Sequence, residues 1–339
     1  MPRIVIELTN RCNLSCGHCF DERHAATGDL PIRIMEKVLR EGKGCGIEQV
    51  SFTGGEPTIH RRFREIIACV AEAGYQFSFV SNGASFPRLY PLLLKHRLSF
   101  AGVTFSLDGA REQTHDQLRG KGSFWQVMRA ASICMFKELP FSLNMVLTAQ
   151  NRNEIGEMVV LAEQLGSAGV RFGHLMPTPE TALRKLDVSP KERREIESEI
   201  WGLKHSASIP IGMAPGYFSE SPFFPCGPLE LEEYNLDYKG NLTLCCQLSG
   251  HSGRNDDADL MGNLSEITLA EACKRFHRRV HVYLSDKREY VNRGMFNDLD
   301  HFPCWYCLKY LGKTSWLSNF PKHPWKGSNK IHTKETHTS

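Results

Sequence analysis

Short apolar segments alternate with amphipathic segments over the first 175 residues of the chain. Val, Ile and Phe, which favour strands, are concentrated in six of the short segments: Ile4–Leu8, Gln49–Thr53, Gln76–Ser81, Gly102–Leu107, Phe141–Leu147 and Val170–Leu175. Between them, apolar residues recur at helical spacing, as at Phe63, Ile66 and Val70. Six strand–helix units in series predict a parallel sheet with helices outside it. Because a closed barrel of this kind needs eight units, the pattern predicts an α/β fold with an open or partial barrel.

The alternation stops near residue 176. Ser189 and Glu192 form a predicted capping box for a helix that ends near His205. A β-hairpin is expected from residues 229–237 and 241–245, and a helix from residues 264–276. The last 19 residues hold four Lys and three His without an apolar period, which indicates disorder. We therefore expect a barrel domain at 1–210, a smaller hairpin-plus-helix domain at 211–312 and a disordered basic tail at 313–339.

Composition and charge narrow the class of protein. The chain has 41 Lys and Arg against 38 Asp and Glu, so its net charge of +3 gives no case for binding nucleic acid or a membrane surface. No apolar run approaches the ~18 residues of a membrane span, and the first residues form no signal peptide. In such a chain, 12 Cys favour metal binding or catalysis over a disulfide scaffold. We expect a cytoplasmic protein.

Three cysteines follow the first predicted strand. Cys12, Cys16 and Cys19 lie within eight residues, on a loop that leaves the strand at its carboxyl end. Three thiolates at this spacing can bind three irons of a 4Fe–4S cluster and leave the fourth iron open. Parallel α/β folds place their sites at this end of the strands. A zinc site completed by His18 and a chance cluster are the alternatives on spacing alone.

Other strands also end in turns of small and polar residues. The second predicted strand is followed by Gly-Gly-Glu-Pro at 54–57, the third by Ser-Asn-Gly at 81–83 and the fourth by Ser-Leu-Asp-Gly at 106–109. A glycine after a strand is usually only a turn. Three such turns on the rim that carries three cysteines favour a binding site at that rim.

The cysteine loop and these turns together resemble the radical S-adenosylmethionine (SAM) enzymes, over about residues 3–180. The resemblance implies a partial (β/α)6 TIM-like barrel whose 4Fe–4S cluster is held by Cys12, Cys16 and Cys19. It also implies that SAM binds the open iron. One-electron reduction would then cleave SAM to methionine and a 5′-deoxyadenosyl radical, which removes a hydrogen atom from the substrate.

The same resemblance implies SAM-binding roles for nine residues: Phe20, Gly54, Gly55, Glu56, Ser81, Asn82, Ser106, Arg119 and Leu175. Glu56 would take the methionyl ammonium, and Arg119 would pair with the carboxylate. For Arg119 and Leu175, an ordinary surface or core position is an equal alternative. His174, at the end of the sixth predicted strand, is the candidate base for the proton that an oxidised substrate loses, and a buried structural histidine is the alternative.

A second group of cysteines lies after the barrel. Cys226, Cys245, Cys304 and Cys307 surround the predicted hairpin and end in a Cys-x2-Cys pair. The pattern resembles the shortened auxiliary-cluster ("twitch") form of the SPASM domain and implies one auxiliary 4Fe–4S cluster. A four-cysteine zinc site is the alternative, and Cys246 could replace its neighbour as a ligand. Three other cysteines are expected to pack in helix cores, namely Cys69, Cys134 and Cys273. Cys45 has no assignment.

The resemblance predicts a radical SAM oxidoreductase with an external one-electron donor such as flavodoxin or ferredoxin. A small molecule such as a sugar or nucleoside is the first expectation for its substrate, because the cysteine loop begins at residue 12 and leaves no N-terminal peptide-recognition domain. The first alternative is a maturase that modifies a ribosomal peptide or a protein side chain. The second is a non-catalytic iron–sulfur or zinc protein, which would have no use for the Gly-Gly-Glu-Pro turn.

Overall fold

A computed structural model describes residues 2–19, 27–248 and 257–326. Its described strands form one sheet in the order β10-β9-β8-β1-β2-β3-β4-β5-β6-β7. The strands are β1 (Arg3–Thr9), β2 (Gln49–Gly54), β3 (Gln76–Ser81), β4 (Phe100–Ser106), β5 (Phe141–Leu147), β6 (Val170–His174), β7 (Ile211–Met213), β8 (Glu233–Leu236), β9 (Asn241–Thr243) and β10 (Leu260–Asn263). Strands β1 to β7 pair in sequence order and in parallel, which confirms the predicted α/β fold.

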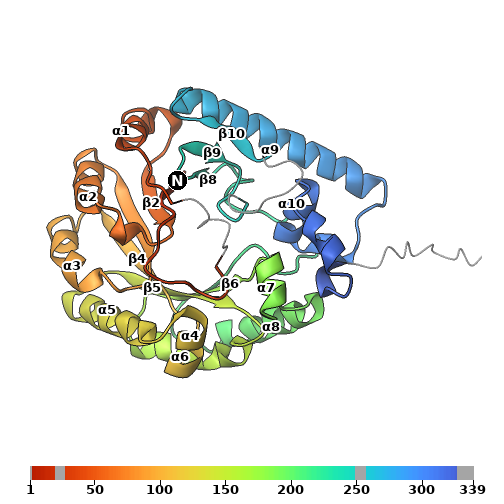
Figure 1. The fold of residues 1–339 in the computed structure, drawn as a ribbon, viewed down its shortest axis with the longest axis horizontal. Helices are drawn as coiled ribbons and strands as arrows, with labels where there is room; N and C mark the ends of the chain where they lie inside the picture. Colours follow the sequence, from red (N-terminus) through yellow and green to blue (C-terminus); the bar gives the residue numbers. More distant parts are fainter. Residues whose placement is uncertain (1, 20–26, 249–256, 327–339) are drawn as a thin grey trace, which may run out of the picture.

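Helices lie outside the sheet, so that the strands form the inner layer of an open ring (Figure 1). The helices are α1 (Ile32–Glu41), α2 (Phe63–Glu72), α3 (Phe86–Lys95), α4 (Glu112–Arg119), α5 (Ser123–Lys137), α6 (Ile155–Gln164), α7 (Pro179–Leu183), α8 (Pro190–Lys204), α9 (Leu269–Asn292) and α10 (Pro303–Tyr310). The capping box predicted for Ser189 and Glu192 is present at the start of α8. Within the described residues, no helix is both long and apolar enough to cross a membrane.

The main core lies between the sheet and the helices. Ile4, Ile6 and Leu8 alternate along β1 and are fully buried. Phe63 of α2 packs edge-on against Phe52 of β2, with ring centroids 6.2 Å apart. Contacts of this kind hold each helix against the strands, and the parallel order brings the carboxyl ends of β1 to β6 to one rim.

The predicted hairpin is part of the barrel sheet. Strand β8 pairs in parallel with β1, where Ile6 lies opposite Leu236, and it pairs antiparallel with β9. Strand β7, which starts just after the predicted boundary at residue 210, pairs with β6. The second cysteine group is therefore attached to the barrel through continuous backbone hydrogen bonds on the β1 side.

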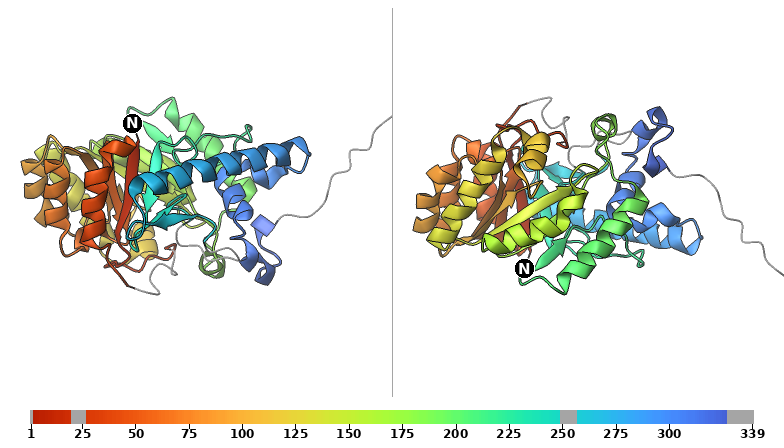
Figure 2. Two further views of the ribbon diagram at one scale, coloured as in Figure 1. Left: turned by 90° about the horizontal axis from the view of Figure 1, so that it is seen from above. Right: turned by 90° about the horizontal axis from the view of Figure 1, so that it is seen from below.

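Helix α9 is longer than the predicted helix at 264–276 and ends at Asn292. Phe276, Val280 and Tyr283 continue one buried stripe at spacings of four and three residues, although charged residues become dense on the other faces. The prediction ended the helix where those charges begin. In Figure 2, α9 extends from the side of the barrel toward the C-terminal helices.

The prediction of a disordered tail is wrong for residues 313–326. A 3-10 helix forms at Ser315–Asn319 and another at Pro324–Lys326. Trp325 is 1% exposed, packs against Phe302 and Trp305, and donates a 2.8 Å hydrogen bond from Nε1 to the carbonyl of Val188. One large aromatic side chain therefore anchors a lysine-rich segment to the core. The rest of the predicted tail, 327–339, lies outside the described residues.

Candidate active site

The loop that carries the first three cysteines is joined to the Gly-Gly-Glu-Pro turn by backbone hydrogen bonds. Gly55 N donates to Thr9 O at 2.7 Å, and Glu56 N donates to Arg11 O at 2.9 Å. A Cβ at Gly54 would lie 2.2 Å from Thr9 O, and one at Gly55 would lie 2.1 Å from Arg11 O. Any side chain would clash with the neighbouring backbone, so the two glycines are required for this close approach.

Cys12, Cys16 and Cys19 lie together on this loop and are partly exposed. Cys19 N donates to Cys16 O at 3.1 Å, and Leu14 N lies 3.5 Å from Cys12 Sγ. Burial raises the pKa of the Cys12 and Cys16 thiols, the charges of neighbouring cysteines raise it further, and Arg119 lowers it. The loop thus brings three soft sulfur donors beside a cation.

Arg119 links the cysteine loop to the buried residue Asp108. Its guanidinium pairs with Asp108 through Nε, and its Nη1 lies 3.9 Å from Cys16 Sγ. Asp108 is fully buried and also accepts a 2.8 Å hydrogen bond from Val146 N, and His18 Nε2 lies 3.2 Å from it. The arginine, its neighbouring histidine and other donors hold the pKa of Asp108 below its usual range despite burial. The role of Arg119 toward the SAM carboxylate stays a prediction.

Glu56 joins the second turn to the third. Its carboxylate accepts hydrogen bonds from Ser81 Oγ at 3.0 Å, from Asn82 N at 2.7 Å and from Thr58 Oγ1 at 2.5 Å. Burial raises the pKa of this carboxyl, and these donors lower it. Asn82 Nδ2 in turn donates to Asn13 Oδ1 on the cysteine loop at 2.8 Å. Three separate segments, which are the cysteine loop and the turns at 54–57 and 81–83, are therefore connected at one rim by the Glu56 carboxylate and this amide.

Three further predicted residues differ in their placement. Ser106 ends β4 and is 8% exposed. Leu175 is buried in a small cluster with Leu118 and Leu186, so it packs under the rim. Phe20 lies outside the described residues.

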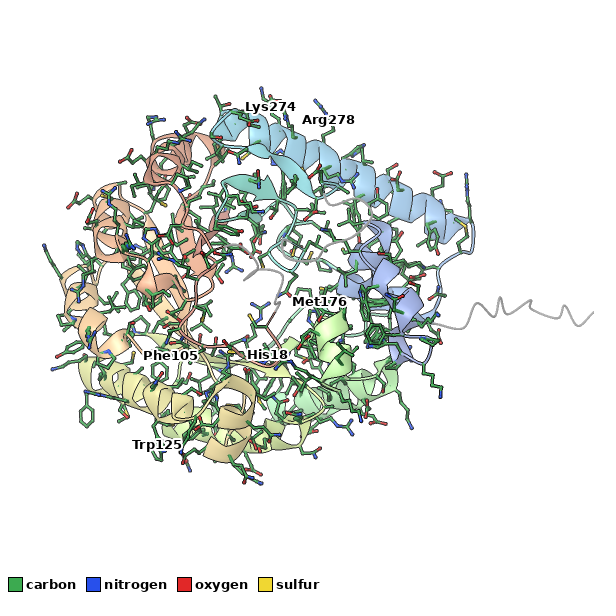
Figure 3. The ribbon with its side chains drawn as sticks, in the orientation of Figure 1. His18, Phe105, Trp125, Met176, Lys274 and Arg278 are labelled. Atoms are coloured by element: carbon green, nitrogen blue, oxygen red, sulfur yellow. The ribbon has the colours of Figure 1, made fainter. Side chains whose placement is uncertain are left out.

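His174, the candidate base, is buried at the end of β6. Its Nε2 lies 3.0 Å from Met176 Sδ, and its Nδ1 has no partner among the described residues. The ring packs directly on Gly216, where a Cβ would lie 2.1 Å from the imidazole. Burial and two nearby arginines hold the pKa of His174 well below its usual value, so the imidazole is neutral. Figure 3 shows His18 and Met176 on the inner side of the ring.

The second cysteine group also converges. Cys226 lies before β8, and Cys245 and Cys246 follow β9, whereas Cys304 and Cys307 begin α10. Burial raises the pKa of the Cys304 thiol, and the charges of Cys307, Cys226 and Cys246 raise it further. Cys246, burial and the charge of Cys304 likewise raise the pKa of Cys245, so the cysteines of the group influence one another.

The donor sets fit iron–sulfur clusters. Thiolate is the ligand that 4Fe–4S clusters take, and each cysteine binds a different iron atom. In the parts of the chain that the structure describes, no three His, Cys, Asp or Glu side chains lie in an arrangement that could hold a single metal ion. The three cysteines at the rim have the ligand type and number of a cluster with one open iron.

Comparison with known proteins identifies the domain in the first half of the chain. Residues 6–162 match the model described as the radical SAM superfamily. This part of the chain therefore carries a radical SAM domain, which implies a 4Fe–4S cluster and SAM. Streptococcus suis SuiB bound to S-adenosylmethionine has the same fold, with a TM-score of 0.65 over 79% of this chain and 64% of that one at 18% identity.

Three curated relatives carry more specific names. The chain is 29% identical to the AdoMet-dependent heme synthase of Methanosarcina barkeri, over 64% of this chain and 63% of the relative. It is 27% identical to the mycofactocin maturase MftC of Mycobacterium tuberculosis, over 66% and 56%. It is 26% identical to the PqqA peptide cyclase of Gluconobacter oxydans, over 79% and 75%. The first two matches thus span about three fifths of those relatives' lengths.

The sequence did not predict the buried side chains that contact the cysteine loop from within the barrel. Asp108 stood in a predicted turn without a role of its own, and His18 was weighed only as a metal ligand. Asp108 pairs with Arg119 and also contacts His18, which is distant from both in sequence. The position of Asp108 directly after a buried strand could have predicted a buried partner, because an unpaired charge there would be costly.

Proposed function

We propose that this chain is a radical SAM maturase that oxidises a peptide or a protein side chain. The observation that carries the proposal is the PqqA peptide cyclase match, which covers 79% of this chain and so must extend beyond the barrel domain. MftC, also named a maturase, supports the same substrate class. The preference for a small molecule rested on the position of the cysteine loop near residue 12, whereas these two named relatives favour the peptide alternative.

The rim supplies the radical chemistry in this proposal. Cys12, Cys16 and Cys19 hold the open cluster, which supplies the one-electron cleavage of SAM when bound. Glu56 and its partner turns position SAM, and Arg119 with Asp108 holds the cysteine loop in place. An external one-electron donor such as flavodoxin or ferredoxin delivers the electron.

The second cysteine group supplies an electron acceptor in this proposal. Cys226, Cys245, Cys304 and Cys307 hold an auxiliary 4Fe–4S cluster in a twitch-type domain. The peptide loses one hydrogen atom to the 5′-deoxyadenosyl radical, then one electron to the auxiliary cluster and one proton to a base, for which neutral His174 is the candidate. One electron enters at the rim and one leaves at the auxiliary cluster, so the net reaction removes two hydrogens from the peptide.

The substrate class is tested with peptides encoded beside the gene. Reconstituted protein, SAM and a one-electron donor are incubated anaerobically with each candidate peptide, and the products are analysed by mass spectrometry. We expect a product that has lost two hydrogens, together with deuterium transfer from labelled peptide into 5′-deoxyadenosine. Formation of 5′-deoxyadenosine that rises with an iron porphyrin precursor but with no peptide would instead favour the activity named for the heme synthase relative.

Glu56→Gln should weaken SAM binding and the hydrogen bonds that connect the turns of the rim. The amide group would face the Asn82 N–H or the Ser81 hydroxyl, so that a buried donor loses its acceptor at a cost of ~1–3 kcal/mol. The methionyl ammonium would also lose its charged acceptor. The dissociation constant for SAM, measured with anaerobically reconstituted protein, should rise at least tenfold. Glu65→Gln on the exposed face of α2 is the matched control and should leave it unchanged. Equal affinity in the Glu56 variant would contradict this role.

A further inference from the structure

Helix α9 presents a buried hydroxyl to the second cysteine group. Tyr283 is fully buried, and its hydroxyl lies 3.1 Å from Cys307 Sγ. A thiolate has no proton to give, so the hydroxyl is the donor to the sulfur whenever Cys307 is a thiolate.

Lys287 lies one helical turn further along the same buried stripe, at a position where the spacing from Phe276, Val280 and Tyr283 calls for an apolar residue. It is 2% exposed, and its ammonium lies 4.4 Å from the centre of the Tyr306 ring. No hydrogen bond or salt bridge joins it to another described residue. Burial lowers its pKa, and Cys307 and Cys226 are the first charges that act against this effect.

Asp300 is the carboxylate whose charge acts on Lys287, and it is already paired. Asp300 binds Lys309, whose Nζ lies 2.8 Å from its Oδ1. Lysine is almost never fully buried without a partner, because removing its charge from water is costly. Among the described residues, the charges of Cys307 and Cys226 act most strongly in favour of the Lys287 cation, and Tyr306, whose ring the ammonium faces, directly precedes Cys307.

Helix α8 carries a second buried cation. Arg193 is 3% exposed, donates to Leu175 O at 2.8 Å and Gly216 O at 3.1 Å, and stacks over the Trp325 ring at 4.3 Å. None of the salt bridges within the described residues involves it. Burial lowers its pKa to about 10, and Tyr217 and Cys304 are the first charges that act against this effect. The charges of two buried cations thus act on the cysteine group.

We propose that Lys287 and Tyr283 are positioning residues that raise the reduction potential of the auxiliary cluster, with Arg193 as a further counter-charge. The inference rests on the auxiliary cluster of the proposed function. A cluster bound by four thiolates is negatively charged and gains one more negative charge on reduction, so a fixed cation and a hydrogen bond to sulfur favour the reduced form. These cations and this hydrogen bond would help a cluster to accept the electron of a substrate radical. A merely structural cluster would not need them.

The test is a redox titration of the auxiliary cluster alone, in the full chain with Cys12, Cys16 and Cys19 replaced by alanine. Lys287→Met is compared with Lys274→Met, which removes the same charge from the exposed outer side of α9 (Figure 3). Electron paramagnetic resonance measures the reduced fraction against applied potential. We expect the ratio of reduced to oxidised cluster in the Lys287 variant to fall about tenfold at any given potential, which corresponds to about 59 mV. Lys274→Met should leave it unchanged.

Two more variants separate charge from packing. Lys287→Arg keeps the cation and should retain the parental potential, whereas Tyr283→Phe removes only the hydroxyl and should lower the potential with iron content intact. If Lys287→Met loses its iron, Tyr283→Phe alone decides the matter. Equal potentials in Tyr283→Phe and its parent, or equal shifts in Lys287→Met and Lys274→Met, would overturn the inference while leaving the cluster in place. Absence of iron from the parent would overturn the auxiliary cluster itself and the inference with it.

Discussion

Replacing Cys12, Cys16 and Cys19 together by alanine should abolish formation of 5′-deoxyadenosine and halve the bound iron, from about eight to about four atoms per chain. The three thiols lie on one loop beside Arg119 and are the proposed sulfur ligands at the rim. Without them SAM has no iron to bind and no electron to receive, so the effect on activity is complete. Iron and sulfide are measured after anaerobic reconstitution, and 5′-deoxyadenosine is measured by chromatography.

The complementary variant separates the two cysteine groups. Replacing Cys226, Cys304 and Cys307 should remove the other half of the iron and leave slow 5′-deoxyadenosine release without substrate. Cys69→Ala should change neither quantity, because Cys69 of α2 is exposed and does not lie in a helix core as predicted. A wild-type protein with about four irons and one zinc would contradict the auxiliary cluster. A triple rim variant that still makes 5′-deoxyadenosine would contradict the assignment of the active site.

Local pattern was sufficient to predict the barrel and the rim. Each strand is a short apolar segment and each helix has a periodic apolar face, so the order of β1 to β6 follows from the sequence alone. The parallel order then places every turn that follows a strand at one edge. Gly54 and Gly55 were visible as a motif, and the structure supplies the reason, which is contact with the backbone at Thr9 and Arg11.

Long-range pairing explains what the pattern could not predict. Asp108, Arg119 and His18 come from three segments, and in the sequence each is only a polar residue near a turn. Trp325 lies in a lysine-rich segment, where composition indicates disorder, yet a pocket made by distant aromatic residues buries it. The burial of Lys287 could have been predicted from the sequence, because Lys287 continues the buried stripe of α9. The predicted helix ended before this position.

Asp108→Asn should be the most destabilising single polar substitution at the rim, at about 3–5 kcal/mol. The carboxylate is fully buried and pairs with Arg119, whose side chain is 11% exposed. Asparagine keeps the shape but removes the charge, so a guanidinium is left unpaired beside the cysteine loop. Anaerobic thermal or urea unfolding of the reconstituted protein, followed by circular dichroism, measures the loss, and iron content should fall with it.

A double variant distinguishes loss of charge pairing from loss of shape. Asp108→Asn combined with Arg119→Met removes both charges and should regain a large part of the stability lost in Asp108→Asn alone, because no buried charge is then left without a partner. Glu157→Gln, which breaks the exposed pair of Arg111 and Glu157, is the matched surface control and should leave the unfolding midpoint unchanged. If Asp108→Asn unfolds at the wild-type midpoint, or if the double variant is no more stable than the single one, the buried pair does not support the cysteine loop in the way its geometry indicates.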